Sequence, residues 1–297
     1  VFGGEAGSFD TSLGVVDTPE YGKVFISIKS TTGNNLTATE KTQLVTDLAK
    51  FTVASITPVI VDPQTTKLIL QTTFQFDSSK TTETAATLET KISNALISFN
   101  ADTLGQFEGM FRHSKVTGLI DDVDTSILSN ITTIKIRKNF TPTLASSTKY
   151  DIYFRNALFN PHSGHNSTAG GILSSTGFKI DGNDNEMFLD DDGIGNVRVY
   201  YLVSGIKTVQ NATQGTIDYD TGQITLNSLN VASISNIRGI TSTTIELTVT
   251  PNSNDVVPVR DQIIEIDTSN SIITVESDSF VGGSADAGVG YTTTSRY

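Results

Sequence analysis

The spacing of apolar residues changes at Pro142, and this change constrains the fold more than any other feature of the 297-residue chain. Before Pro142, apolar side chains recur every second residue in some segments, as in strands, and every third or fourth residue in others, as in helices. After Pro142 only the strand spacing remains, in short runs separated by Gly, Asn and Asp. The sequence therefore predicts an α+β chain, in which a mixed module precedes an antiparallel β domain.

Residues 21–142 are predicted to form the α/β module. Thr37 and Glu40 have the spacing of a capping box and precede leucines at helical intervals, which indicates a helix over about 38–51. The remaining elements expected here are helical stretches at 83–99 and 103–121 and strands at 23–29, 53–61, 66–77 and 131–140. This order matches a ferredoxin-like split βαβ α/β-sandwich, in which helices cover one face of an antiparallel sheet.

Residues 143–280 are predicted to form an antiparallel β domain made of hairpins. The expected strands are rich in β-branched and aromatic residues and lie at 149–158, 171–180, 186–190, 196–206, 215–226, 243–251, 262–267 and 271–277. Asp220 and Gly222 lie in the turn of one predicted hairpin, where Gly222 can adopt the positive φ that a tight turn needs.

The two ends of the chain are predicted to lie outside these modules. Residues 1–20 are rich in Gly, Asp and Ser and are expected to form a linker. Residues 281–297 hold too few large apolar side chains to bury a core, so a flexible tail is expected there. The first residues lack the features of a signal peptide, and the missing initiator Met leads us to expect a piece of a longer chain.

Composition excludes several classes of function. The chain has no Cys, which rules out disulfides, thiolate metal sites and a cysteine nucleophile. Its net charge is −12, and no apolar run reaches the roughly 18 residues of a membrane span, so neither nucleic acid nor membrane is an expected partner. The charge is uneven, with a net −2 in residues 1–150 and −10 in residues 151–297. The 44 Thr and 30 Ser supply uncharged strand and loop residues.

The most suggestive metal-binding string is 184–196, in which Asp190, Asp192 and Asn196 could serve as calcium ligands. With Gly193 aligned to the invariant glycine of an EF-hand loop, the first and last ligand positions carry Phe188 and Val199, so the pattern fails at both ends. We therefore interpret the string as a hairpin turn with no metal. Its turn residues would be Asp192, Gly193 and Gly195.

Other candidate sites also favour a structural interpretation. His162 and His165 form an H-x-x-H pair that could ligate a metal, but no acidic residue accompanies them, and His113 stands alone. Asp121 and Asp122 are adjacent in the sequence, as are the aspartates near 190, which argues against a shared catalytic cleft on a strand. The chain has no nucleophile elbow, and its Gly-rich string at 282–290 lacks the ending of a phosphate loop. We expect no catalytic residue, no cofactor and no small-molecule substrate.

A set of strings in order along the chain resembles the C-terminal half of the T4-like phage baseplate wedge proteins, the products of gene six, which are relatives of the baseplate J family. The first string is the Gly-Gly-Glu segment that runs into Tyr21-Gly22-Lys23-Val24-Phe25. The others are 104–130, 133–142, 188–202, 215–226 and 250–267.

This resemblance implies a structural virion protein of a contractile tail, and not an enzyme. Such proteins pair with a second copy of themselves, contact other wedge proteins and join wedges into a ring around the tail hub. It also implies a location in the tail baseplate of the virion, after assembly in the host cytoplasm. From the charges, we expect the nearly neutral α/β module to make the self-contact, while the acidic module faces solvent or a basic neighbour.

Two alternatives remain open. A carbohydrate-binding or adhesin-like β surface protein would explain the Thr-rich strands, and it predicts a cluster of exposed aromatic side chains on the β domain. A calcium-dependent surface protein would instead use the loop from Asp190 to Asn196.

Overall fold

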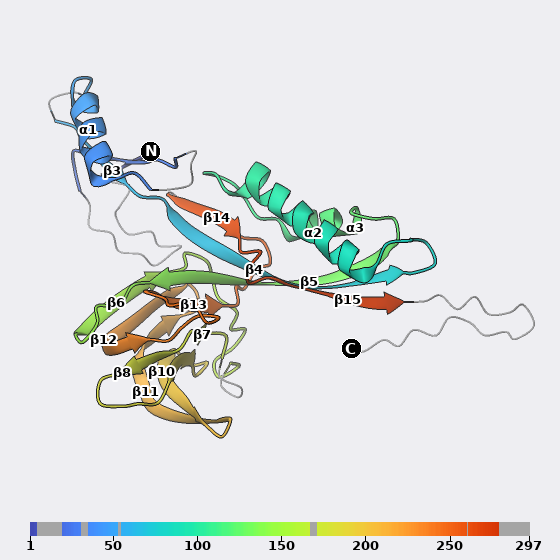
Figure 1. Cartoon of the computed structure of the whole chain (residues 1–297). Coiled ribbons are helices and arrows are strands. Elements are labelled where there is room, and N and C mark those ends of the chain that lie inside the picture. The colour runs from blue at the N-terminus through green and yellow to red at the C-terminus, as the bar shows by residue number, and fades with distance from the viewer. Residues whose placement is uncertain (5–19, 31–34, 53–54, 167–170, 260, 279–297) are drawn as a thin grey trace, which may run out of the picture. The chain divides into compact units, whose positions relative to one another are not determined.

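The computed structural model describes residues 1–4, 20–30, 35–52, 55–166, 171–259 and 261–278 (Figure 1). Within these ranges the chain combines a few helices with many strands, as the α+β expectation requires. It divides into two compact units, each made of several segments. The first holds residues 1–68, 103–111 and 134–265, and the second holds 69–102, 112–133 and 266–297.

The first unit begins with a small sheet of three strands in the order β1-β2-β3: β1 (Phe2–Gly3), β2 (Lys23–Ser27) and β3 (Thr57–Val61). β2 and β3 run parallel because helix α1 (Ala38–Ala49) connects them. The predicted capping box of α1 is confirmed, since Thr37 Oγ1 accepts a hydrogen bond from Glu40 N and a Glu40 carboxylate oxygen accepts one from Thr37 N.

The first unit also contains a closed barrel. Its strands are β8 (Phe178–Ile180), β9 (Met187–Asp191), β10 (Asn196–Val203), β11 (Ile206–Asp218) and β12 (Gln223–Ile234). Each pairs antiparallel with the next, and β12 returns to pair with β8, so the five strands close a ring and β6 (Ser147–Tyr153) adds to β12. The residues that fill the barrel are fully or almost fully buried and include Phe178, Met187, Leu189, Val197, Val199, Ile224 and Leu226.

A third sheet is built on two long strands, β4 (Gln64–Asp77) and β5 (Ile127–Phe140), each of which contributes residues to both units. Its order is β14-β4-β5-β13-β7, with β15 also paired to β4. The additional strands are β7 (Ser174–Ser175), β13 (Ile245–Val249), β14 (Gln262–Ile266) and β15 (Ile272–Asp278).

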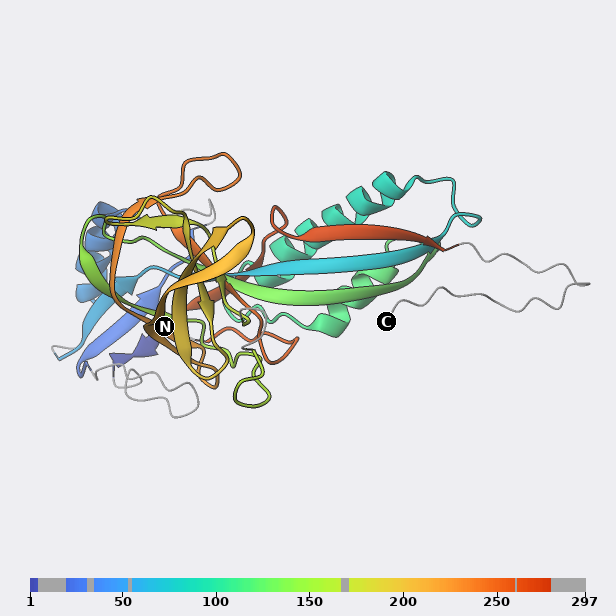
Figure 2. The same ribbon diagram turned by 90° about the horizontal axis from the view of Figure 1, so that it is seen from below.

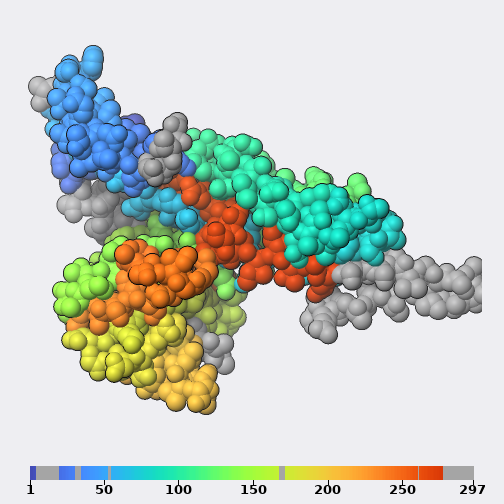
Figure 3. All heavy atoms as spheres, viewed as in Figure 1, coloured from blue at the N-terminus to red at the C-terminus, as the bar shows by residue number. Residues whose placement is uncertain are grey.

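In the second unit, β15, β4 and β5 lie side by side, with helices behind them (Figure 2). Its α-helices are α2 (Ala85–Phe99) and α3 (His113–Asp121), and the π-helix η2 (Asn100–Leu104) begins in this unit and ends in the first. The apolar stripe expected on the second helix is buried at Leu88, Ile92 and Leu96, and the strand side of the core contains Leu70 and Phe74. In the space-filling view, teal α2 atoms form much of the visible surface of this unit (Figure 3).

Two expectations for residues 21–142 need correction or stay open. The ferredoxin-like split βαβ sandwich is not confirmed, because β2 and β3 lie in one sheet while β4 and β5 lie in another with strands from the C-terminal part of the chain. That long-range pairing includes β15, which runs parallel to β4 rather than antiparallel. The boundary between residues 142 and 143 stays a prediction.

The expected helical stretch at 103–121 was wrong in its first part, since only α3, at its end, is an α-helix. Gly109 lies so close to the carbonyl groups of Thr103 and Leu104 that a Cβ would not fit there. The chain then turns, and Phe111 forms a β-bridge with Val256. The backbone N–H and C=O groups of Phe111 are bonded to Val256 and so are not part of a helix.

Most of the predicted linker at 1–20 and the tail at 281–297 lie outside the described residues. Among the helices that the structure describes, none has the length and apolar character needed to span a membrane.

Candidate functional site

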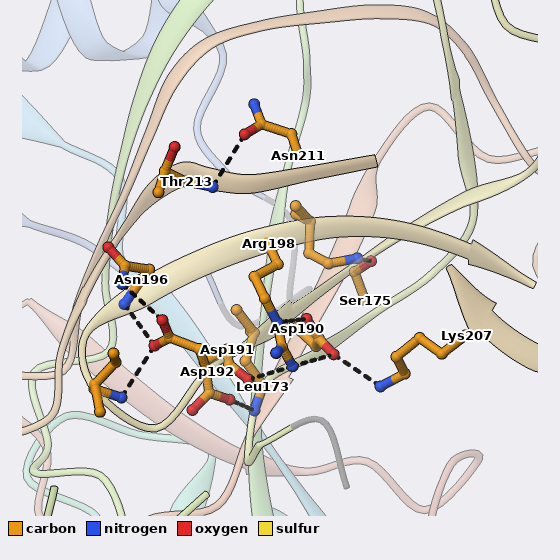
Figure 4. Close-up of polar contacts among 12 residues, drawn as sticks. Leu173, Ser175, Asp190, Asp191, Asp192, Asn196, Arg198, Lys207, Asn211 and Thr213 are labelled. Carbon is orange, nitrogen blue, oxygen red and sulfur yellow. Dashed lines mark hydrogen bonds and ion pairs between the residues drawn. The ribbon is translucent and has the colours of Figure 1, made fainter. Parts of the chain in front are cut away.

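Three consecutive aspartates form a polar cluster at the end of strand β9: Asp190 and Asp191 are its last two residues, and Asp192 follows it (Figure 4). Asp190 and Asp191 are almost completely buried, and Asp192 is partly exposed. Because buried carboxylates are costly without partners, the donors that surround them decide what this cluster can do.

Asp190 binds two cationic side chains. Arg198 on β10 makes a bidentate contact: its Nε donates to Asp190 Oδ1 and its Nη2 donates to Asp190 Oδ2, each at 2.9 Å. Lys207 on β11 donates to Asp190 Oδ2 at 2.7 Å and also lies over the ring of Tyr200. The hydrogen bond to Asp190 raises the pKa of Arg198. These contacts tie together three adjacent strands of the barrel.

Asp191 is held by neutral donors. Its Oδ1 accepts from the backbone N–H groups of Ile172 and Leu173, at 2.7 and 2.8 Å, and its Oδ2 accepts from the Tyr219 hydroxyl at 2.6 Å. Burial raises the pKa of Asp191, against the effect of these hydrogen bonds. The pKa of Tyr219 is raised as well, by burial and by the neighbouring carboxylate. Asp191 thus connects β9 to the end of β11 and to the segment before β7.

Asp192 organises the turn between β9 and β10. Its carboxylate accepts hydrogen bonds from Ile194 N, Asn196 N and Asn196 Nδ2. Burial alone would raise the pKa of Asp192, but the bonds from Asn196 and Ile194 lower it. Gly193 and Gly195 have φ values of 74° and 111°, which favour glycine. Of the three residues in the candidate calcium loop, Asp190 and Asp192 thus accept hydrogen bonds from the protein's own donors, and Asn196 is one of those donors.

The second predicted turn, with Asp220 and Gly222, joins β11 to β12. Gly222 has a φ of 71°, but the residue that holds the turn is Asp218, which was not among the predicted turn residues. Its carboxylate accepts from Asp220 N and Thr221 N, and its carbonyl oxygen accepts from Gly222 N. An Asp two residues before a turn is the signal that would have identified it.

The remaining candidates lie in other parts of the chain. Asp121 accepts a hydrogen bond from Asn130 at the end of α3, and a ring nitrogen of His113 lies 2.7 Å from the carbonyl oxygen of Thr132. His162 and His165 lie close together in a loop between β6 and β7. Among the described residues, no group of three or more His, Asp or Glu side chains is placed to hold one metal ion.

The geometry thus describes an α+β protein, mostly strand, whose buried carboxylates cross-link neighbouring strands. Two comparisons name the class more closely. Residues 2–61 match the family model for the baseplate structural protein gp6, C-terminal domain I, and residues 68–139 match the model for C-terminal domain III of the same protein.

A curated relative agrees with the family models. The chain is 25% identical over 138 residues to the baseplate wedge protein gp6 of Enterobacteria phage T4. The aligned region is 46% of this chain and 21% of that protein. These matches confirm the resemblance to the C-terminal half of the T4-like phage baseplate wedge proteins.

Proposed function

We propose that the chain is a structural subunit of a contractile-tail phage baseplate wedge, and not an enzyme. The matches to gp6 over residues 2–61 and 68–139 support this role. We further propose that copies of the chain associate with one another and with other wedge proteins to join wedges into a ring around the tail hub. Its place would be the virion, after assembly in the host cytoplasm.

We assign the proposed self-association to one surface of the second unit. In Figure 2 the helices lie behind the β15-β4-β5 sheet, so the side of the sheet that faces away from them is in view. The strand register places nine side chains on this side, in three cross-strand rows. We call it the open sheet face. Its rows are Ile272, Gln71 and Thr133; Thr274, Thr73 and Ile131; and Glu276, Gln75 and Ser129. Hydrogen bonds connect Ser129 to Gln75, and Gln75 to Glu276, along the last row.

The antiparallel register of β4 and β5 follows from the same contacts. As the residue number rises along β4, the number of the contacting residue on β5 falls: Gln71 contacts Thr133, and Gln75 contacts Ser129. This places Thr73 opposite Ile131, in the middle row. Thr73 is therefore the central side chain of the open sheet face.

Charge supports a second copy as the occupant of the open sheet face. The chain carries a net −12, so most of its surfaces would repel a copy of themselves. Of the nine side chains, only Glu276 is charged, while Ile131 and Ile272 are 69% and 54% exposed. Two such faces related by a two-fold axis can pack as sheet on sheet without burying many like charges.

Cross-linking tests this contact cleanly because the chain has no Cys. Facing sheets lie about 10 Å apart, so a Cys at the central position should reach its own copy through a short bismaleimide. We expect Thr73→Cys to give a covalent dimer, and adding Ile131→Glu to abolish it through repulsion. The matched control is Ser98→Cys, at an exposed position of α2.

Two outcomes would contradict the open sheet face as the self-contact. One is a yield of dimer from Thr73→Cys no greater than that from Ser98→Cys. The other is loss of the Thr73→Cys dimer on reversing two exposed acidic residues of the β domain, Asp181→Lys and Asp184→Lys. The second outcome would indicate that the self-contact lies in the acidic part of the chain.

The carbohydrate-binding or adhesin-like alternative has weaker support. It requires a cluster of exposed aromatic rings on the β domain, as platforms for sugars. In the described part of residues 143–280, Phe159 is the aromatic side chain in the exposed class, at 38%. One ring does not make such a cluster, so we favour the baseplate role.

A further inference from the structure

The loop between β6 and β7 holds His162 and His165, and hydrogen bonds anchor it to the rest of the first unit. Its early part is fixed by Leu158 N to Tyr219 O at 2.6 Å and by Phe159 N to Thr250 O at 3.0 Å. Its later part is fixed by Gly164 N to Gly193 O at 2.8 Å. The backbone that carries the two imidazoles is therefore set before any ligand binds.

The two imidazoles face each other across a short gap. His165 Nδ1 lies 3.3 Å from His162 Nε2, and the ring planes are perpendicular. His165 N also donates to His162 O at 3.1 Å, which closes the backbone between them into a turn. The edge-to-face contact of the Phe159 ring with His165 restricts the rotation of that imidazole. Both histidines are exposed to solvent.

This distance is that of two ligands on one metal ion. Zinc binds imidazole nitrogen at about 2.0–2.1 Å, so two nitrogens at a tetrahedral angle lie about 3.3 Å apart. We propose that His162 and His165 chelate a divalent transition-metal ion, through His162 Nε2 and His165 Nδ1. In the neutral pair one facing nitrogen carries a proton and the other accepts it. To bind the ion, the donating ring takes the tautomer that holds this proton on its other nitrogen, and a small rotation of one ring then directs both lone pairs to the ion.

The chemistry of the pair selects the class of ion. Imidazole suits zinc, copper and nickel, whereas calcium and magnesium prefer oxygen ligands. With two protein ligands and exposed rings, the other coordination positions are open to water or to a side chain of a neighbouring subunit. The sequence alone gave no reason to favour this site, since spacing does not fix the distance between two loop side chains. The site does not depend on the proposed baseplate role.

Calorimetric titration of the full chain, prepared without a polyhistidine tag, tests the proposal. We expect one zinc or nickel ion per chain in the wild type and no measurable binding of magnesium. His162→Ala and His165→Ala should each weaken zinc binding by about tenfold or more, because one of two ligands is lost. His113→Gln is the matched control and should leave the affinity unchanged.

Two results would overturn the proposal. One is the absence of zinc binding at millimolar concentration in the wild type. The other is equal binding by the wild type and by a folded variant with both His162 and His165 replaced by Ala. Far-ultraviolet circular dichroism of each variant, with its thermal midpoint, shows that the fold is intact, so a loss of binding reports on the ligands themselves.

Discussion

The hydroxyl of Tyr219 donates a 2.6 Å hydrogen bond to Oδ2 of the buried Asp191. Tyr219 follows the end of β11, and Asp191 is the last residue of β9. The bond therefore holds the residue that follows β11 against the last residue of β9. It also gives the carboxylate a third donor, in addition to the backbone N–H groups of Ile172 and Leu173.

Tyr219→Phe should destabilise the protein by about 1–3 kcal/mol, because it leaves a buried carboxylate oxygen without its donor. The loss should be larger at pH 7 than at low pH. Burial raises the native-state pKa of Asp191 above its ordinary value of 3.8, so the native carboxyl is neutral below that raised pKa and needs its donors less. Urea unfolding at several pH values measures both effects. Equal losses for Tyr219→Phe and for Tyr201→Phe, at a half-buried position of β10, would contradict this account.

Local features of the fold could be predicted from the sequence because their causes are local. Alternating apolar residues predicted most of the strands after Pro142, and the Thr37 and Glu40 capping box predicted the start of α1. Asp192, Gly193 and Gly195 lie in the turn between β9 and β10. The short Asp192 side chain and the positive φ values of the two glycines determine this turn within a few residues.

Features that depend on distant residues could not be predicted. Nothing in the sequence near β4 shows that β15, about 200 residues later, pairs with it in parallel. The partners of Asp190 and Asp191 could not be predicted for the same reason, since Arg198 and Lys207 lie on the next two strands and Tyr219 follows the second of these. Period-two spacing identifies strands but does not say which strands are neighbours.

Arg198 and Lys207 bind the same carboxylate, yet we expect their removal to have unequal effects. The Arg198 side chain is 18% exposed and makes two bonds to Asp190 and one to Asp191 O. The Lys207 side chain is 32% exposed and makes one. Arg198→Met should therefore cost about 3 kcal/mol and Lys207→Met about 1 kcal/mol. Chemical denaturation of both variants checks this, and a larger loss for Lys207→Met would refute the ranking.

Gly222 should tolerate a side chain less well than Gly182, although both have a positive φ, of 71° and 76°. A Cβ on Gly222 would meet the backbone carbonyl oxygen of Asn156, whereas a Cβ on Gly182 would meet no atom within 4 Å. Gly182→Ala should cost about 1 kcal/mol for the backbone conformation, and Gly222→Ala about 3 kcal/mol because the clash adds to it. Thermal melts of the pair measure the difference. Similar midpoints would mean that the turn shifts away from Asn156 without cost.

Lys138 on β5 should make the stability of the protein rise with pH above about 8. Burial, together with repulsion from Arg155, lowers the pKa of Lys138 from 10.5 to about 8, although Asp261 acts in the opposite sense. Between these two values the unfolded chain binds a proton that the native chain does not, so stability increases with pH across that window. At pH 7 both states are protonated, and the cost of burying the charge is present in full.

Lys138→Met removes this cost and should stabilise the protein at pH 7, by up to about 3 kcal/mol for a shift of this size. The gain should shrink as the pH rises from 8 to 10.5, because the native wild-type amine is then already neutral. Urea unfolding of wild type and variant at pH 7, 8.5 and 10 gives the comparison, with Lys135→Met on the same strand as the control. A gain that stays constant over this range would show that better apolar packing, and not the removal of a buried charge, is its cause.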